Sequence, residues 1–266
     1  MVPPTEEQHN LIRKASQLLR EARHTVALTG AGISTPSGIP DFRSPGSGIW
    51  SKYSPMEVAS LSAFRYYPLR FYDWIRPFVK SLFLADPNPA HIALARLENQ
   101  QLLRSVITQN IDALHQKAGS RKVIEVHGTY QTLTCLGCYR QIQATDQFLT
   151  GFLENEENPH CPDCDNLLKP DIILYEEQLP AETWRMARKE VNACDLLLVL
   201  GSTLTVTPVC DLPLTALSKG AKMIIINRTN THLDHLAAVY LQGDLEELLP
   251  IIADKVLNHE DQEKPA

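Results

Sequence analysis

Two pairs of cysteines have the spacing of a metal site. The first pair reads Cys135-Leu-Gly-Cys138 and the second Cys161-Pro-Asp-Cys164, with residues 139–160 between them. Zinc prefers four soft ligands in a tetrahedron, and each CxxC turn offers two sulfurs. Four thiolates would leave no position for a water molecule, so the spacing predicts one structural Zn²⁺ rather than a catalytic one. Two redox-active pairs are the alternative interpretation, which the doubled knuckle disfavours.

A glycine turn follows a short β-prone run at residues 25–29. It reads Gly30-Ala31-Gly32-Ile33-Ser34. Glycines let such a turn approach a phosphate closely, and the N-terminus of a following helix favours negative charge. The pattern is not GxGxxG, because Thr35 holds the sixth position, and no P-loop Lys-Ser/Thr follows, which excludes a kinase or ATPase of that type. Alone, the turn indicates nucleotide binding only weakly.

Three polar residues after apolar runs could take part in a reaction: Asn110, Asp112 and His127. Imidazole titrates near neutral pH, so His127 could act as a general base. His127, Asp112 and Ser34 each also have a structural alternative. A lone histidine is usually a satisfied structural residue, Asp112 could form a turn or cap a helix, and Ser34 could merely cap a helix.

The remaining cysteines and several histidines are interpreted as structural. Cys194 and Cys210 lie beside apolar segments and are expected to pack rather than react. His160 neighbours a knuckle whose four sulfurs already suffice for zinc. His91 and His115 are assigned no chemical role.

Alternating strands and helices are expected to position these residues. An N-terminal helix is indicated by the capping-box spacing of Thr5 and Gln8 and by apolar residues at helical intervals. Further helices are expected at residues 90–97 and 212–217, between short apolar runs that suit a parallel sheet covered on both faces. The expected fold class is therefore α/β, with a Rossmann-like doubly wound parallel sheet. Its strands are predicted at residues 25–29, 106–107, 196–200 and 223–226.

Two segments fit that alternation poorly and are assigned to a smaller domain. Residues 40–83 are rich in aromatic side chains and predict a helical module over a cleft, whereas residues 130–169 hold the cysteines and predict a zinc ribbon. Residues 259–266 are expected to form a disordered tail. The Rossmann-like domain is then discontinuous and comprises residues 1–39, 84–129 and 170–258.

Composition narrows the classes of partner and the compartment. The chain has 266 residues, 44% of them hydrophobic, and a formal charge of -6, which argues against direct nucleic-acid binding. No apolar run reaches the roughly 20 residues of a membrane span, and no signal peptide is expected. Paired cysteine clusters indicate a reducing compartment, so the cytoplasm is the expected location. The oligomeric state is not determined by the sequence, with a monomer as the favoured expectation.

In combination, the motifs resemble the sirtuins and indicate a bacterial-type catalytic core. They follow the family's order and spacing over residues 8–253 and so cover nearly the whole chain. The resemblance rests on GAGISTPSGIPDFR at residues 30–43, Gln109-Asn110-Ile111-Asp112, His127-Gly128-Thr129, Pro170-Asp171, Gly201-Ser202-Thr203, Asn227 and Gly243-Asp244.

The resemblance implies a bilobal NAD-dependent protein-lysine deacylase, with the acylated lysine of a protein or peptide entering between the two domains. His127 and Asn110 would be catalytic, and Phe42 would shield the reactive sugar carbon. The substrate peptide would contact Ile173, Tyr175, Glu176 and Val206. NAD would contact Gly30, Ala31, Gly32, Thr35, Phe42, Arg43, Gln109, Asn110, Ile111, Asp112, Ser202, Thr203, Asn227 and Asp244.

The implied reaction consumes NAD as a co-substrate and moves no hydride. Nicotinamide leaves the ribose while the site orients it and excludes water, and the acyl oxygen captures the sugar carbon. His127 then activates a ribose hydroxyl. The products would be nicotinamide, free lysine and O-acyl-ADP-ribose.

Two departures from the family pattern bear on the substrate. Glu176 stands where many sirtuins have the glycine of Phe-Gly-Glu, and it could favour basic residues near the acyl-lysine. Ile75 and Phe78 align with the Tyr-x-x-Arg pair of sirtuins that remove acidic acyl groups. An acyl carboxylate would be buried unpaired there, which predicts a preference for acetyl, or for longer apolar groups, over succinyl.

Other functions are compatible with parts of the pattern. An NAD glycohydrolase or mono-ADP-ribosyltransferase would use the same nicotinamide pocket but pass the sugar to water or to another side chain. A zinc-ribbon interaction module with vestigial catalysis is the alternative from another class, which the intact His127, Asn110 and Asp112 disfavour.

Overall fold

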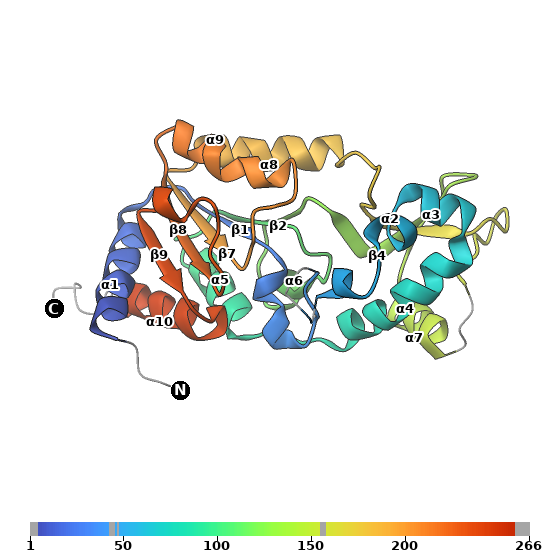
Figure 1. Ribbon diagram of the computed structural model, residues 1–266, viewed down its shortest axis with the longest axis horizontal. Coiled ribbons are helices and arrows are strands. Elements are labelled where there is room, and N and C mark those ends of the chain that lie inside the picture. Colours follow the sequence, from blue (N-terminus) through green and yellow to red (C-terminus); the bar gives the residue numbers. More distant parts are fainter. Residues whose placement is uncertain (1–4, 43–45, 47, 155–157, 259–266) are drawn as a thin grey trace.

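The molecule has two parts (Figure 1). The larger part is a parallel sheet with its helices, and the smaller part combines helices with a second sheet. The structure is a computed structural model, and it describes residues 5–42, 46, 48–154 and 158–258. The tail predicted at residues 259–266 lies outside the described residues, and so does Arg43, which was predicted to contact NAD. Within the described chain, no helix is long and apolar enough to cross a bilayer.

Six parallel strands form the large sheet in the order β3-β2-β1-β7-β8-β9. The central strands are buried along their whole length, which matches their continuous apolar sequences. The strand order reverses between β1 and β7, and open α/β sheets bind ligands at such a switch point. The strands span Thr25–Thr29 (β1), Ser105–Thr108 (β2), Val123–Glu125 (β3), Leu196–Leu200 (β7), Lys222–Asn227 (β8) and Val239–Gln242 (β9).

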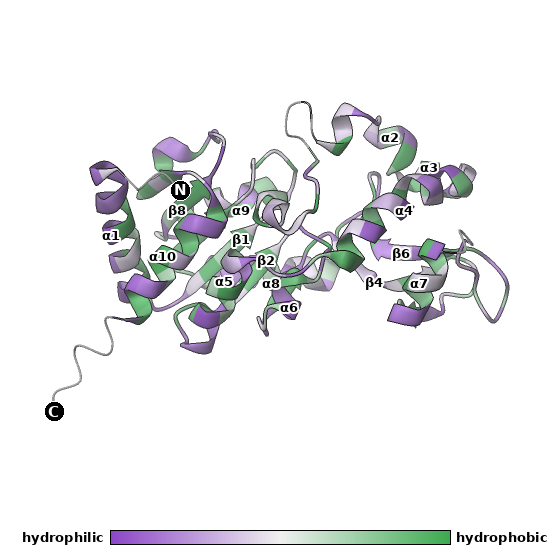
Figure 2. Cartoon of the chain, turned by 90° about the horizontal axis from the view of Figure 1, so that it is seen from below, coloured by the Kyte–Doolittle hydropathy of each residue, from purple (hydrophilic) through white to green (hydrophobic). Residues whose placement is uncertain are grey.

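Helices cover both faces of this sheet, as the doubly wound prediction requires. One buried cluster joins the sheet to α1, α5 and α10, and a second joins it to α8 and α9. In Figure 2 the helices around the sheet carry both hydrophilic and hydrophobic residues, in keeping with one buried side and one exposed side. The predicted capping box is confirmed at the start of α1. These helices span Glu6–Glu21 (α1), Pro89–Asn99 (α5), Leu114–Lys117 (α6), Ala181–Ala193 (α8), Leu212–Ser218 (α9) and Leu245–Leu257 (α10).

The smaller part packs helices and a three-stranded antiparallel sheet around an aromatic core. Phe71 and Tyr72 of α4 are almost fully buried there, with Phe64 of α3 packed against both rings. The sheet has the order β5-β4-β6. Its elements span Pro55–Val58 (α2), Leu61–Tyr66 (α3), Pro68–Leu84 (α4), Gly128–Cys135 (β4), Gln141–Gln143 (β5), Asp146–Glu154 (α7) and Leu168–Ile172 (β6).

Three local features differ from the sequence expectations. The glycine turn leads into two short 3₁₀ helices, Ala31–Ile33 and Thr35–Ser37, and not into an α-helix. The cysteine-bearing segment contains the amphipathic helix α7, which packs Leu149 and Phe152 into the aromatic core. Strand β6 pairs with β4 up to Ile172 and so crosses the boundary expected at residue 170. The other 3₁₀ helices are Ile49–Ser51, Val209–Asp211 and Asp234–Leu236.

Candidate active site

The glycine turn lies at the switch point of the large sheet, against the residue that follows β7. Gly32 donates its N–H to the carbonyl of Gly201 at 2.9 Å. A Cβ atom at Gly30 or at Gly32 would lie 2.8 Å from that carbonyl oxygen, which is too close for any side chain. The glycine turn thus packs closely against the turn at Gly201. This contact explains why residues 30 and 32 are both glycine.

Ser34 links two polar residues, Asp112 and Asn110, next to the glycine turn. Its hydroxyl donates to Asp112 Oδ2 at 2.6 Å and accepts from Asn110 Nδ2 at 3.0 Å. It makes no capping bond to the 3₁₀ helix that it precedes, so the capping alternative is wrong. Asp112 is 3% exposed and also accepts the N–H of Leu114 at 2.9 Å, which gives it the turn-forming role as well. Burial raises the pKa of Asp112, and the hydrogen bond from Ser34 is the largest opposing effect.

Two buried histidines support this network as neutral side chains. Asn88 donates its N–H to His91 Nδ1 at 3.4 Å, so His91 Nε2 carries the proton and faces the Ser34 hydroxyl at 3.4 Å. Burial lowers the pKa of His91 to about 4, and burial also lowers the pKa of His115. His115 Nε2 contacts the Thr29 hydroxyl at 3.0 Å. Both residues are structural, as the sequence indicated.

His127 is held in one orientation by a backbone carbonyl. Its Nδ1 lies 3.0 Å from the carbonyl oxygen of Gln109, so Nδ1–H is the donor and Nε2 carries the lone pair in the neutral ring. The Gln109 side chain donates in turn to the Ser202 hydroxyl at 3.0 Å, and Asn110 Nδ2 donates to the carbonyl of Gly30 at 3.1 Å. These bonds join the ends of β1, β2 and β7 around one site.

Two neighbouring cavities meet at His127. One has a volume of about 710 Å³ and a largely apolar wall, and the other, of about 200 Å³, lies along the glycine turn and the residues after β7 and β8. Volumes of this order suit a small organic ligand. Both cavities are lined by Ala31, Phe42, Gln109, Asn110, His127 and Val206, so they form one continuous trough.

Most of the predicted site residues line this trough. Ile111, Asp112, Ile173, Tyr175 and Glu176 line the larger cavity. Asp244 lines neither cavity: its carboxylate pairs with Arg228, and its backbone precedes α10. The smaller cavity is lined by the predicted Gly30, Gly32, Thr35, Ser202, Thr203 and Asn227.

The larger cavity also has an apolar wall, in which the sequence had singled out only Ile75 and Phe78, through their alignment with the Tyr-x-x-Arg pair. Trp74 of α4 stacks on Trp50 with ring centroids 6.0 Å apart, and Trp50 lies edge-on to Tyr175. Ile75, Phe78 and Leu82 of α4 complete this side. The aromatic enrichment of residues 40–83 was the available signal, but only the fold shows which side chains face the cavity.

The segment after β6 closes the other side of the larger cavity. Ile173 donates its N–H to the carbonyl of His127 at 2.8 Å, and Tyr175 exchanges backbone hydrogen bonds with Ala59 and Leu61. Glu176 adopts a left-handed conformation, with φ 73°, at the position where glycine was expected. Its carboxylate accepts the N–H of Ser62 at 2.8 Å. Hydrogen bonding with the Ser62 side chain, and then with its N–H, lowers the pKa of Glu176. The side chain therefore fastens the segment to the start of α3.

Substitutions at Glu176 should separate backbone strain from this capping bond. Glu176→Ala loses the bond to Ser62 but keeps a Cβ atom at positive φ, whereas Glu176→Gly loses the bond and relieves the strain. We expect Glu176→Ala to lower Tm by about 2–4 °C relative to the parent, with Glu176→Gly between the two. Differential scanning calorimetry of the three proteins measures this order. A Tm of Glu176→Ala equal to that of the parent would show that the bond contributes nothing.

The four cysteines of the two knuckles converge beside the small sheet. Their sulfurs all lie within 4.8 Å of one another, and the Cys135–Cys164 and Cys138–Cys161 pairs are 3.5 Å apart. A tetrahedron with Zn–S bonds of 2.3 Å has edges of about 3.8 Å, so the arrangement fits zinc. Cys135 Sγ also accepts the N–H groups of Gly137 and Cys138 at 3.4 Å, as a metal-bound thiolate does.

His160, which neighbours the second knuckle, and the two cysteines outside the knuckles make ordinary structural contacts. His160 Nδ1 donates to the carbonyl of Asp165 at 2.7 Å and does not belong to the sulfur cluster. Cys194 is buried and donates to the carbonyl of Val191, and burial raises its thiol pKa to about 11. Cys210 is only partly buried and packs against the second core cluster.

Comparison with known proteins identifies the family. The model of the Sir2 family matches residues 30–208, from the glycine turn to the end of the cavity wall. The chain belongs to the Sir2 family. Among its Sir2 relatives, NAD-dependent protein deacylase 2 of Archaeoglobus fulgidus is 44% identical over 92% of this chain and 96% of the relative. The NAD-dependent protein deacetylase of Thermotoga maritima is 43% identical over 86% of this chain and 92% of the relative.

Solved structures of Sir2 enzymes show the same fold. One from a study of the mechanism and regulation of Sir2 enzymes has a TM-score of 0.88 and 42% identity, and covers 94% of this chain and 99% of that one. A Sir2 enzyme with a deacetylated p53 peptide and 3′-O-acetyl ADP ribose has a TM-score of 0.86 and 40% identity, with 92% and 98% coverage. Sir2Af2 bound to a myristoylated histone peptide has a TM-score of 0.82 and 38% identity, with 96% and 100% coverage. The α/β fold with a smaller second part is thereby confirmed.

Proposed function

We propose that this Sir2-family chain removes acyl groups from protein lysines, with NAD as co-substrate, and forms nicotinamide, O-acyl-ADP-ribose and free lysine. The observation that carries this proposal is the position of His127, where the smaller cavity along the glycine turn meets the larger, more apolar cavity. The relatives named as NAD-dependent deacetylases and deacylases, and the solved structures with peptide and acetyl-ADP-ribose, support it.

The two cavities offer complementary sites for the two substrates. The smaller one has the polar and glycine backbone wall that suits the adenosine half of NAD, and Ser202, Thr203 and Asn227 line it. The larger one suits the nicotinamide half beside Ile111 and Asp112 and the acyl-lysine beside Ile173, Tyr175 and Val206. NAD supplies a ribose–nicotinamide bond whose cleavage activates the sugar carbon.

The residues of the chain orient the reactants and move one proton. Gln109 fixes the His127 ring so that the Nε2 lone pair is the basic site, and His127 takes the proton of a ribose hydroxyl there. Asn110 and Asp112 are held by Ser34 and Gly30, which positions the nicotinamide side of the trough before substrates bind. The aromatic wall beside Phe42 and Trp50 excludes water from the reacting carbon.

A single assay tests the proposed reaction against its rivals. Nicotinamide release from NAD is measured with and without an acetyl-lysine peptide, together with formation of O-acetyl-ADP-ribose. We expect release that depends on the peptide, with one O-acetyl-ADP-ribose for each nicotinamide. Peptide-independent release would instead support an NAD glycohydrolase, and ADP-ribose attached to protein would support an ADP-ribosyltransferase.

The acyl group is proposed to be apolar. Ile75 and Phe78, at the positions of the Tyr-x-x-Arg pair, are buried and line the larger cavity without any charge. A buried succinyl carboxylate would find no cation at these positions, so we expect acetyl peptide to exceed succinyl peptide in kcat/KM by about 100-fold. The measurement uses matched peptides that differ only in the acyl group.

A double substitution provides the matched control for that acyl preference. Ile75→Tyr together with Phe78→Arg supplies a hydroxyl and a guanidinium that can bind the succinyl carboxylate. The double variant should therefore decrease or reverse the ratio of kcat/KM for acetyl peptide to that for succinyl peptide. Equal turnover of acetyl and succinyl peptides by the parent would contradict the proposal.

We also propose that the four cysteines hold one structural zinc and that the enzyme acts in the cytoplasm. The sulfur geometry supports the metal, because four thiolate ligands fill a tetrahedral shell. The absence of disulfides among the six described cysteines is compatible with a reducing compartment.

A further inference from the structure

A buried lysine lies behind the segment that closes the acyl-lysine side of the cavity. The Lys169 side chain is only 7% exposed, at the start of β6. Its ammonium donates to the carbonyls of Pro170 at 3.1 Å and Ile172 at 2.8 Å, and it contacts Glu177 Oε2 at 2.9 Å. These three partners match the three protons of the ammonium group, so the buried charge is fully satisfied.

Glu177 uses the same carboxylate oxygen to close the turn at residues 174–177. Its Oε2 accepts the N–H of Leu174 at 2.8 Å, and its own N–H donates to the carbonyl of Leu174 at 3.1 Å. The two bonds fasten both ends of the turn, with Tyr175 and Glu176 at its tip. Because Lys169 forms an ion pair with Glu177, this pair connects the turn to β6, and it is largely shielded from water.

The residue that precedes the turn is bonded directly to the backbone of His127. Ile173, between the end of β6 and the turn, donates its N–H to the carbonyl of His127 at 2.8 Å. Residues 172–179 together line the larger cavity. A shift of the turn would therefore move the wall against which an acyl-lysine lies relative to the imidazole, and misplacement by about 1 Å can cost two orders of magnitude in rate.

We propose that Lys169 and Glu177 are positioning residues that set the place of the acyl-lysine relative to His127. This inference rests on the proposed function. Neither side chain needs to touch the reacting atoms: Glu177 holds the turn, and Lys169 holds Glu177 and the end of β6. The pair should affect recognition of the peptide, while the smaller cavity along the glycine turn stays intact.

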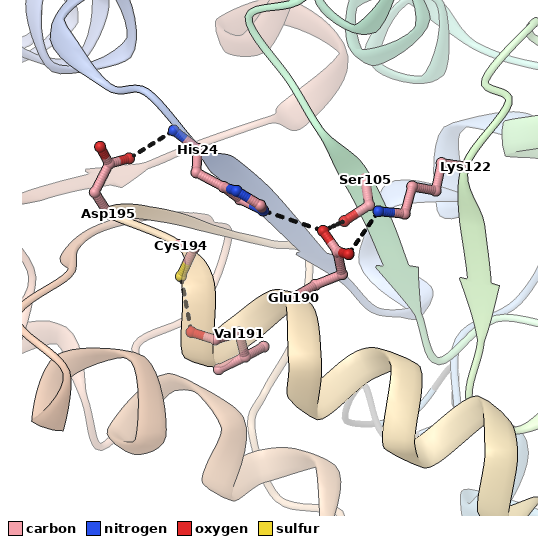
Figure 3. Close-up of polar contacts among 7 residues, drawn as sticks. All are labelled: His24, Ser105, Lys122, Glu190, Val191, Cys194 and Asp195. Atoms are coloured by element: carbon pink, nitrogen blue, oxygen red, sulfur yellow. Dashed lines mark hydrogen bonds and ion pairs between the residues drawn. The ribbon is translucent and has the colours of Figure 1, made fainter.

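Another buried carboxylate that contacts a lysine, here the half-exposed Lys122, provides a control. Glu190 of α8 is 9% exposed and accepts bonds from Lys122 at 2.5 Å and from Ser105 at 3.2 Å, with His24 at 3.1 Å (Figure 3). Burial tends to raise its pKa, but the bonds from Lys122 and His24 outweigh burial and lower it. His24 and Lys122 directly precede β1 and β3, so this cluster lies at the end of the sheet opposite the cavity.

The decisive comparison is between Glu177→Gln and Glu190→Gln in the full-length protein. Both substitutions remove one charge from a carboxylate that contacts a lysine, and both should lower Tm. Only Glu177→Gln should raise KM for an acetyl-lysine peptide, by roughly ten- to a hundredfold, with KM for NAD within about twofold of the parent. Equal effects of the two variants on peptide KM would overturn the proposal.

A double variant separates positioning from stability. Lys169→Met with Glu177→Leu replaces the ion pair by apolar groups of similar size, which should recover part of the Tm lost in Glu177→Gln. The defect in peptide KM should persist, because leucine has no oxygen to accept the N–H of Leu174 that closes the turn. If peptide KM recovered together with Tm, Lys169 and Glu177 would only stabilise the fold, and the positioning proposal would be wrong.

Peptide binding without turnover distinguishes this inference from the proposed function. The Kd of a fluorescent acetyl-lysine peptide is measured by anisotropy for the parent and for Glu177→Gln. Binding by the parent that weakens in Glu177→Gln would support the positioning role even if the parent releases no nicotinamide. No binding by the parent would overturn both proposals.

Discussion

Replacement of His127 by alanine is expected to lower kcat for deacylation of an acetyl-lysine peptide by roughly 10²–10⁴-fold. The reason is geometric as well as chemical. Gln109 fixes the ring through Nδ1, so the basic nitrogen is Nε2, at the junction of the two cavities. Alanine offers no group that could take the proton of a ribose hydroxyl. The measurement is the rate of O-acetyl-ADP-ribose formation under saturating NAD and peptide.

Two further variants make the His127 result specific. His127→Asn has an amide in place of imidazole and can still donate a hydrogen bond, but it cannot act as a base near neutral pH, so it should share the defect. His232→Ala removes an exposed histidine that lines neither cavity and should leave the rate unchanged. His127→Ala should retain NAD binding, since the glycine turn and the residues after β7 and β8 remain. A rate within tenfold of the parent would exclude His127 as the base.

The glycine turn shows how far sequence reasoning reaches. The strand, the turn and the placement of polar residues at strand ends followed from apolar runs and glycines, and the structure has them in those places. The reason for the glycines differs from the expected one. Gly32 meets Gly201, a contact between residues far apart in the sequence, and no local pattern reveals such a partner.

The wall of the larger cavity at residues 172–179 was harder to predict from the sequence, again because its contacts join residues far apart in the chain. Tyr175 pairs with Ser60 across a long separation in the chain, and Lys169 is buried although lysine is mostly exposed in proteins. The only sequence signal for the positive φ of Glu176 was that many sirtuins have glycine at this position, and glycine adopts positive φ readily. The amphipathic helix α7 was missed because the flanking cysteines dominated the interpretation of that segment.

Metal removal tests the other large effect that the structure predicts. The buried side chains around the sulfurs are few, namely Leu133 and Leu168 with Cys135 and Cys161 themselves. So small a cluster cannot hold its part of the fold without a cross-link, and structural zinc contributes about 10–16 kcal/mol of apparent binding free energy in small metal-dependent folds. We expect about one zinc per chain, and a fall in Tm of at least about 10 °C after chelation.

Loss of the metal should also abolish deacylation, although the cysteines line neither cavity. Strand β4 runs from Gly128, next to His127, to Cys135, a proposed metal ligand, and it pairs with β6, which leads into the turn at residues 174–177. Disorder at the sulfurs would therefore displace both His127, directly before β4, and the turn that follows β6, because β4 and β6 are paired. Cys161→Ser should reproduce the chelated state in metal content, Tm and activity, whereas Cys210→Ser should match the parent in all three. Full activity of a metal-free protein would show that β4 keeps its place without zinc.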